Sequence, residues 1–542
     1  MVKRNFLVTL FAIALLLQFG SVVHAAAGAD ATELGNITFL NSGSPEAQPD
    51  FIKGVLFLHN FEYDQARRAF RRAQSINPSF AMAYWGEAMT YHQSLWSNQW
   101  QTEGQRALLK LGSTTKKRMS NAPTQRERDY IKATETLFGL TKQSNGKSKY
   151  ERDILYRDQM RRLHAKYPND LEATTFYGLS ILGVGSANRG YTAYMKAAAV
   201  LTEVWDANRL HPGAAHYLIH AYDDPVHAVL GVPMARAYSK IAPDAAHAQH
   251  MTSHIFVALG LWDDVVAANL RALKVASFAS VDTDEMSREE SHYFYWLQYA
   301  RLQQGRTTDA EDLLKFLHER LDKSPSPRER AYYGAMFARY IIDTEDWNAA
   351  TKWAVAASIE IPTTHYYFAQ AFAAIKLGQL EGVQQIIDQV RPSGQGNPEI
   401  VLNKPEIEVL HLELEALMAL ANGNGDTAVT LLRQAVAMEL KMPFKYGPPR
   451  LIKPTGELLG DVLLELGQTR EAVQAYQDQL SRTPQRTHSL LGLARAASAH
   501  GDESTSGEAY HRLFEIWHDA EITLPAIDEV RIATGSLDRR SE

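Results

Sequence analysis

Residues 49–92 read PDFIKGVLFLHNFEYDQARRAFRRAQSINPSFAMAYWGEAMTYH, and this stretch decides the fold of the 542-residue chain. Gly54 lies in a first predicted helix and Ala66 in a second, where small side chains let two antiparallel helices approach closely. Phe70 is expected to fill the space between these helices. Pro78 ends the second helix, because proline cannot continue one. The stretch therefore predicts a pair of antiparallel helices.

The same pattern returns along the chain. Gly467 and Gly501 are separated by one repeat of about 34 residues, as are Gly54 and Ala88. Later copies share a glycine where a first helix must end, because glycine readily takes the left-handed conformation that closes a helix. These glycines are Gly260, Gly305, Gly378, Gly467 and Gly501. We predict about twelve helix pairs between residues 47 and 518 and almost no strand.

Two regions depart from the repeat. Residues 97–170 predict helices with longer connections, which is an irregular version of the same pattern. Residues 441–456, KMPFKYGPPRLIKPTG, are rich in proline and predict an extended crossing between two helix pairs.

These offsets resemble those of the tetratricopeptide repeat superfamily over most of the chain. The strings FEYDQARRAF, HPGAAHYLIHAYDDP and HMTSHIFVALGLW also resemble a group of exported bacterial proteins of this class, for which no activity is established. The resemblance implies an all-α fold, a right-handed α-solenoid of antiparallel helix pairs. Proteins of this superfamily often bind an extended ligand, such as a peptide, in the concave groove that the first helices line, and the resemblance implies the same here.

The N-terminus and the repeats together predict how the chain is organised. Lys3 and Arg4 precede an apolar run and a small-residue stretch that ends at Ala25, the pattern of a cleaved signal peptide. We therefore expect a periplasmic or secreted protein with no membrane span after cleavage. The expected parts are a signal peptide (1–25), a leader (26–46), N-terminal repeats with an irregular insertion (47–170), histidine-rich central repeats (171–290), C-terminal repeats (291–518) and a tail (519–542).

The composition excludes several kinds of site and partner. The chain has no cysteine, so it can form neither disulfides nor a cysteine-ligated zinc site. Its formal net charge is −6, and this weak acidic balance argues against nucleic acid as a partner. The fold must therefore be held by packing, either alone or together with a ligand.

Histidine is concentrated between residues 211 and 262, where seven of the 19 histidines lie. Residues three, four or seven apart share one face of a helix. One such set is His216, His220 and Asp223, and another is His247, His250 and His254. Imidazoles on adjacent turns can bind one divalent transition metal, such as zinc or iron. The alternative is that they are polar groove residues or packing residues bonded to carboxylates and backbone.

If a metal site exists, the expected ligands come from both helices. The first choice is His216, His220, His250 and His254, with His247 and Asp223 as substitutes or as partners that orient the imidazoles.

The first helices of the later repeats predict a ligand groove. Its expected lining is His292, Tyr295, Trp296, Tyr299, Tyr332, His365, Phe368 and Phe372. Aromatic side chains offer a large contact area at low entropic cost, so Trp296 and Tyr299 are expected to dominate ligand affinity.

Two functions are compatible with these features. The leading hypothesis is an exported scaffold that binds a peptide or protein segment in its concave groove. The alternative is a metal-dependent enzyme, a hydrolase or an oxidoreductase, with its histidine cluster in the groove. The sequence contains no motif that decides between an enzyme and a binding protein.

Overall fold

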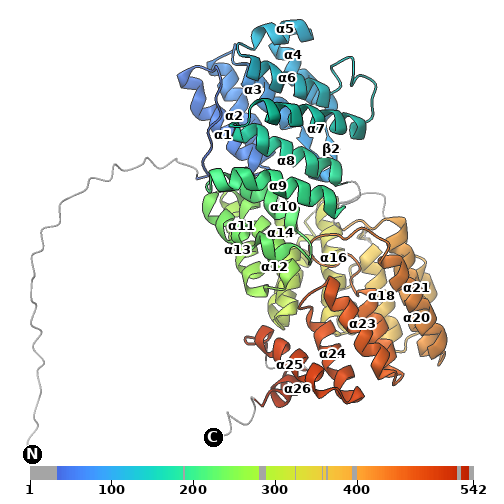
Figure 1. Ribbon diagram of the computed structural model, residues 1–542. Coiled ribbons are helices and arrows are strands. Elements are labelled where there is room, and N and C mark those ends of the chain that lie inside the picture. The colour runs from blue at the N-terminus through green and yellow to red at the C-terminus, as the bar shows by residue number, and fades with distance from the viewer. Residues whose placement is uncertain are drawn as a thin grey trace, which may run out of the picture.

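A computed structural model describes residues 33–186, 190–279, 289–323, 325–356, 358–361, 364–392, 400–521 and 526–535. Within these ranges the chain forms 26 α-helices and a single two-stranded hairpin, so the all-α solenoid is confirmed (Figure 1). The predicted signal peptide lies outside the described residues. None of the described helices combines the length and the apolar character that a bilayer crossing requires.

The helices follow one another as antiparallel pairs. Those up to the middle of the chain are α1 (Gln48–His59), α2 (Tyr63–Ile76), α3 (Ala81–Met89), α4 (Gln101–Leu111), α5 (Thr115–Asn121), α6 (Gln125–Leu137), α7 (Lys149–Lys166), α8 (Leu171–Gly185), α9 (Tyr191–Ala207), α10 (Pro212–Tyr222), α11 (Ala228–Ile241), α12 (Ala246–Leu259) and α13 (Trp262–Ala279). The hairpin pairs β1 (His92–Gln93) with β2 (Asn98–Gln99), and the 3-10 helices are η1 (Pro45–Ala47) and η2 (Ser94–Trp96).

The remaining helices run to the C-terminus. They are α14 (Glu290–Gln303), α15 (Thr307–Arg320), α16 (Pro327–Thr344), α17 (Ala349–Lys352), α18 (Thr364–Lys376), α19 (Val383–Ile387), α20 (Lys404–Ala421), α21 (Gly425–Glu439), α22 (Thr455–Glu465), α23 (Thr469–Arg482), α24 (Thr487–His500), α25 (Glu503–Ile516) and α26 (Ile527–Ala533). All five predicted turn glycines have positive φ, from 68° at Gly260 to 83° at Gly501.

An aromatic side chain of each well-formed second helix is held between glycines of the flanking first helices. A Cβ atom added to Gly54 would lie 2.7 Å from the ring of Phe70, and one added to Gly86 only 2.3 Å from it. Tyr476 in α23 has the same relationship to Gly492 in α24, at 2.2 Å. Glycine weakens a helix interior by about 1 kcal/mol relative to alanine, and here the buried ring offsets that loss.

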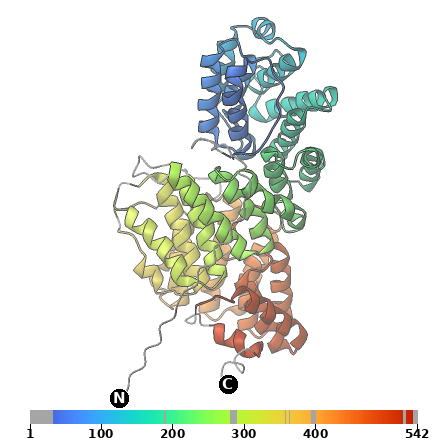
Figure 2. The same ribbon diagram turned by 90° about the vertical axis from the view of Figure 1, so that its left-hand side faces the viewer.

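The C-terminal repeats fold back onto the central ones. The indole nitrogen of Trp262, at the start of α13, donates to Gln485 O at 3.2 Å. The indole nitrogen of Trp517, after α25, donates to Gln303 O at 3.0 Å. Figure 2 shows the same closure, with the red C-terminal helices beside the green and yellow ones and the blue helices at the far end of the molecule.

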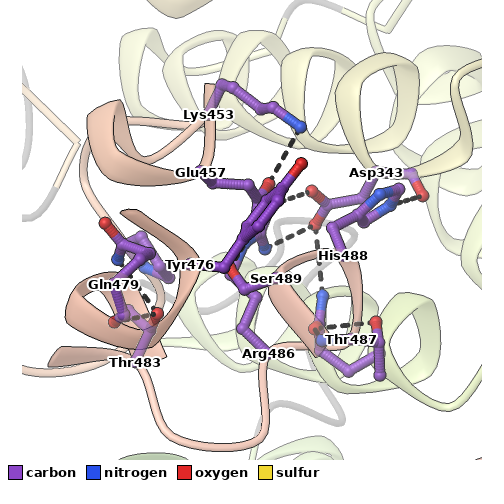
Figure 3. A network of polar contacts seen from close by, with 12 residues as sticks. Asp343, Lys453, Glu457, Tyr476, Gln479, Thr483, Arg486, Thr487, His488 and Ser489 are labelled. Carbon is purple, nitrogen blue, oxygen red and sulfur yellow. Dashed lines mark hydrogen bonds and ion pairs between the residues drawn. The ribbon is translucent and has the colours of Figure 1, made fainter. Parts of the chain in front are cut away.

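A buried ion network fixes this closure (Figure 3). Arg486, which precedes α24, donates through Nη2 to Asp343 of α16 at 2.7 Å and through Nε to Glu457 of α22 at 2.8 Å. Lys453 lies 3.0 Å from Glu457, and the Ser489 hydroxyl donates to Glu457 at 2.6 Å. The network therefore links three helices whose residues are far apart in the sequence.

The predicted extended crossing is confirmed, and it lies against the inner face of the central helices. Residues 441–454 connect α21 to α22 without a helix. Arg339 of α16 donates to Ile452 O at 2.9 Å, and His365 of α18 donates to Arg450 O at 2.9 Å. The chain therefore fills part of its own concave surface, and we call residues 441–454 the inner strap.

Both ends of the described chain are more ordered than the sequence suggests. In the leader, the Asn36 amide donates to Leu210 O at 2.9 Å, and Phe39 packs edge-on against Trp85 at 5.3 Å between ring centroids. The region predicted as a plain tail contains α26, whose Val530 is fully buried. An apolar helix face was present there, but it is too short for the repeat pattern to reveal.

Candidate metal site

Six histidines of three inner helices form two groups of three. His216 and His220 come from α10, and His247 comes from α12; we call these three residues the first triad. His250 and His254 of α12 join His292 of α14 as the second triad. Within each triad, one ligand atom per ring lies within 4.8 Å of the other two.

The two triads are neighbours in one continuous cluster of rings. Ring centroids lie 5.0 and 5.1 Å apart within the first triad and 5.2 and 4.3 Å apart within the second. Between the triads, His220 lies 5.8 Å from His254, and His247 lies 6.4 Å from His250. The arrangement arises because α10, α12 and α14 are first helices of successive pairs, which bring equivalent faces side by side.

The proton positions on two of these rings follow from their hydrogen bonds. His216 Nδ1 lies 2.7 Å from His59 O, and His254 Nδ1 lies 2.7 Å from Asp223 Oδ2. A carbonyl and a carboxylate only accept, so both Nδ1 atoms carry the proton. In a neutral imidazole the other nitrogen, Nε2, then has a free electron pair.

His250 is oriented in the same way from another helix. Its Nδ1 lies 2.8 Å from Asn269 Oδ1, and the Asn269 amide is held in that orientation because its Nδ2 donates to Val265 O at 2.9 Å. Burial lowers the pKa of His216, His247 and His250 well below the ordinary value, so these rings are neutral. The buried Nε2 atoms of His216 and His247 have no hydrogen-bond partner.

His292 differs from the other rings because it contacts one of them directly. Its Nε2 lies 2.7 Å from His250 Nε2, and its Nδ1 lies 3.4 Å from the Tyr332 hydroxyl. Since the proton of His250 is on Nδ1, His292 Nε2 is the donor in this contact. For His292 to act as a ligand through Nε2, its proton must move to Nδ1, where Tyr332 can accept it.

The first triad is covered by the ring of Phe61, a residue with an unusual backbone conformation. Phe61, in the turn after α1, has φ 57°, and its ring lies 4.3 Å from His216 and 5.7 Å from His247. Its position in the turn corresponds to that of Gly467 after α22. A bulky residue rarely adopts a positive φ, and such strain is often found at functional sites. Trp96 of η2 covers His247 from another side, at 6.0 Å.

The second triad is covered by an aromatic core residue and by the inner strap. Trp296 lies 4.5 Å and Tyr446 lies 5.2 Å from the ring of His254. Gly447 follows with φ 82°, and a Cβ atom there would lie 2.4 Å from the Trp296 ring. A cavity of about 90 Å³ remains between this strap and α12, and Asp223 is part of its lining.

The open ligand groove expected from the sequence is not found at these positions. Trp296 is 0% and Tyr299 1% exposed, and the residues buried with them are Tyr295, Tyr332, His365, Phe368 and Phe372. The expectation that Trp296 and Tyr299 face a ligand is therefore wrong for this structure, because the inner strap and Arg339 occupy the space they face. Of the predicted groove residues, His292 is only partly buried.

A third group, around His59, resembles a metal site but has no free ring nitrogen. His59 Nε2 donates to Glu172 at 2.8 Å, while its Nδ1 accepts from the Tyr217 hydroxyl at 3.0 Å. His211 Nδ1 accepts from the Ala214 amide at 3.2 Å, which leaves its proton on Nε2, 3.3 Å from Glu172. These hydrogen bonds satisfy both rings, so we interpret this group as a structural network.

The predicted ligand set changes in the structure. His216, His220, His250 and His254 do not form one group, because the α12 histidine beside His216 is His247, at 5.1 Å, while His250 lies 4.3 Å from His292. His247, expected as a substitute, belongs to the first triad, and His292, expected in the groove, belongs to the second. Asp223 has the expected role of orienting a ring. Sequence reasoning missed Asn269 and Phe61, which lie outside any histidine pattern.

The architecture and the interior cluster define a helical repeat protein with a histidine-lined core. A family model of the tetratricopeptide repeat matches residues 457–486, which cover α23 and most of α22. This match, together with the antiparallel pairs along the rest of the described chain, supports the tetratricopeptide repeat superfamily.

Comparison with solved structures gives only distant likenesses. A human IFIT1 dimer with m7Gppp-AAAA is 13% identical, with a TM-score of 0.35, and the match covers 88% of this chain and 91% of that one. Yeast Tom70 is 15% identical, with a TM-score of 0.25 and coverage of 92% and 97%. No curated protein matches the sequence.

Proposed function

We propose that this repeat protein binds a transition-metal ion, such as zinc or iron, in its histidine-lined interior. The observation that carries the proposal is the orientation of the rings. The Nδ1 protons of His216, His250 and His254 are held by backbone, amide and carboxylate acceptors, so each Nε2 presents an electron pair to the cluster. Metal-ligating histidines have this arrangement, in which the other ring nitrogen donates to a fixed acceptor.

The energetics support the same proposal. A buried polar atom without a partner reduces stability by about 1–3 kcal/mol, and His216 Nε2 and His247 Nε2 are two such atoms within one triad. Coordination would satisfy both atoms at once. A packing role alone explains the aromatic contacts of these rings, but it leaves their electron pairs without a partner.

The number of ligands bears on the choice between a structural and a catalytic site. A structural zinc site has four protein ligands, whereas catalytic sites have three and leave one position for water or substrate. Each triad offers three imidazoles. This count favours the metal-dependent enzyme, a hydrolase or oxidoreductase, over a purely structural ion.

The proposal is tested by the metal content of the untagged protein, measured by mass spectrometry after dialysis. We expect at least one equivalent of a transition metal, or its uptake when zinc, iron or copper is added. His365→Gln is the control, because this buried histidine lies outside both triads and glutamine can still donate to Arg450 O. Less than a tenth of an equivalent of every metal, with no uptake, would contradict the proposal.

A second function, binding of a peptide or protein segment, is favoured by a separate cavity. A space of about 300 Å³ lies between α16, α18, α22 and α24, on the side of the repeats that holds ligands in this class of protein. Its lining includes Trp347, Phe372, Lys376, His488 and Arg495. Acidic residues, Glu345, Asp461 and Glu465, also line it, so aromatic side chains with charges of both signs suit an extended polar segment.

Selection from a random peptide library tests this second function. We expect selected peptides to lose about tenfold in affinity, equivalent to about 1.4 kcal/mol, on Trp347→Ala. Trp296→Ala should instead lower the stability of the fold, because Trp296 is buried. If no selected peptide depends on Trp347, the cavity does not have this role.

We also propose that the protein is exported. The basic start, apolar run and small residues before Ala26 support cleavage after Ala25 and a periplasmic or secreted location. The N-terminal sequence of the mature protein from a secreting host tests this, and a protein that still begins at residue 1 would contradict it. Because the net charge is weakly negative, we expect no nucleic-acid partner.

A further inference from the structure

We infer that the interior holds two metal ions, one on the first triad and one on the second, within a single chamber. This inference rests on the metal binding proposed above and concerns how many ions are bound and where. It starts from the six rings, which separate into two groups of three ligand atoms instead of converging on one point.

A single ion cannot use all of these rings. A four-coordinate ion takes at most four nitrogens, at about 2.0–2.1 Å each. An ion on the second triad alone would leave the buried His216 Nε2 and His247 Nε2 without a partner. An ion on the first triad alone would leave His250, His254 and His292 as a second set of three ligand atoms within 4.8 Å of one another.

Each triad is also oriented by its own set of contacts. The first triad is fixed through His59 O, which accepts from His216. The second is fixed through Asp223 and Asn269, which accept from its two α12 histidines. No anchor serves both triads: His59 ends α1, Asn269 lies in α13, and Asp223 follows α10, the helix that carries two ligands of the first triad.

The charge of the chamber indicates which ions suit it. Imidazole side chains contribute no negative charge, and Asp223 supplies a carboxylate that contacts a ligand ring. Two dications would bring four positive charges into a buried site, which is unfavourable without a bridging anion. Imidazole ligands suit copper, which has the highest affinity in the divalent series. Copper also has a stable monovalent form, so two copper(I) ions would bring only two positive charges into the chamber.

The test is a titration of the full-length protein with copper(I) without oxygen, and separately with zinc(II), followed by equilibrium dialysis and metal analysis. We expect two equivalents of copper per chain. His247→Gln and His292→Gln should each retain one equivalent, and the double variant should retain none. These two residues are chosen because they lie at the edges of the cluster, where glutamine disturbs the packing least. His211→Asn, in the satisfied network, should retain two.

The outcomes separate the two proposals. One equivalent in the wild type, abolished by either single variant, would mean a shared ion and would overturn the two-ion inference while leaving metal binding intact. No binding of either metal would overturn both. X-ray absorption of the loaded wild type needs no variant: about three imidazole nitrogens per metal support one ion on each triad, and an average of two or fewer overturns that assignment.

Discussion

His254 donates its Nδ1 proton to Asp223 across 2.7 Å, and this contact joins the middle of α12 to the end of α10. Both side chains are almost fully buried. A carboxylate in this position fixes the ring and makes its other nitrogen a better ligand. The pair therefore couples the geometry of the second triad to the helix that carries two ligands of the first.

Asp223→Asn should weaken metal binding without removing a ligand. Asparagine can still accept from His254 but lacks the charge, and the loss of such a partner typically lowers metal affinity 10–100-fold. Competition with a chelator of known affinity measures the effect, while the number of bound ions should not change. Asp224→Asn is the matched control, because Asp224 binds His227 and backbone amides outside the triads. Equal affinity in both variants would contradict the assigned role.

Phe61→Gly should destabilise the protein and speed the loss of metal. Removing a buried phenylalanine side chain typically lowers the free energy of unfolding by about 3–5 kcal/mol. Glycine recovers about 1–2 kcal/mol of this, because the backbone at φ 57° is no longer strained. We expect a net loss of about 1–4 kcal/mol by denaturant unfolding, and faster metal transfer to a chelator.

Phe61→Leu is the control for this change. It keeps an apolar cover and the backbone strain, so its rate of metal loss should stay near that of the wild type. A Phe61→Gly protein that releases metal no faster than the wild type would show that Phe61 does not limit access.

His211→Asn should affect stability but not metal binding. Asparagine is a good N-cap, so it can still accept from the Ala214 amide at the start of α10. Glu172 loses one of its two histidine partners, which should lower the free energy of unfolding by about 1–3 kcal/mol. Thermal unfolding and metal analysis of the same preparation check both parts. A change in the number of bound ions would contradict the structural role of this network.

Stability should fall in acid because of the network around Arg486. Burial alone raises the pKa of a carboxyl group, but Arg486 and Arg339 lower that of Asp343 overall, and Arg486 and Lys453 lower that of Glu457. A carboxylate with a lowered folded pKa stabilises the fold fully above its unfolded pKa of about 4. That contribution is lost as the pH falls through the lower folded pKa.

Arg486→Met separates this effect from general acid denaturation. At pH 7 the variant should be about 3–5 kcal/mol less stable, because two buried carboxylates lose the guanidinium they share and keep only Arg339 and Lys453. The difference from the wild type should shrink below about pH 4, as those carboxylates protonate. Urea unfolding at both pH values measures it, and a constant difference would exclude the network as the cause. Arg495→Met removes a half-exposed ion pair with Glu529 and should change stability by less than about 1 kcal/mol.

The repeat architecture could be predicted because it depends on short-range features. The spacing of Gly54, Ala66 and Phe70 describes how two adjacent helices pack, and each turn glycine acts within its own turn. These contacts involve neighbours in the chain, so a local pattern determines them. The helix α26 was missed because few residues define it.

The site could be predicted only in part. Helical spacing placed His216 with His220 and His250 with His254, but their division into triads depends on how α10, α12 and α14 pack side by side. The burial of Trp296 and Tyr299 depends on the inner strap, which comes from far along the chain and has no repeat pattern. Phe61 was not recognised because the residue with positive φ in its turn is a phenylalanine and not a glycine or an asparagine.

The inner strap has a consequence for the order of events during synthesis. All six histidines are made before residues 441–454, and long-range contacts form late because the chain must first close a large loop. An ion can therefore reach the rings while the strap is still absent, and Tyr446 and Gly447 close over the second triad afterwards. On the proposed metal binding, ions bound before the strap closes would afterwards exchange with the surroundings slowly, when the C-terminal half opens.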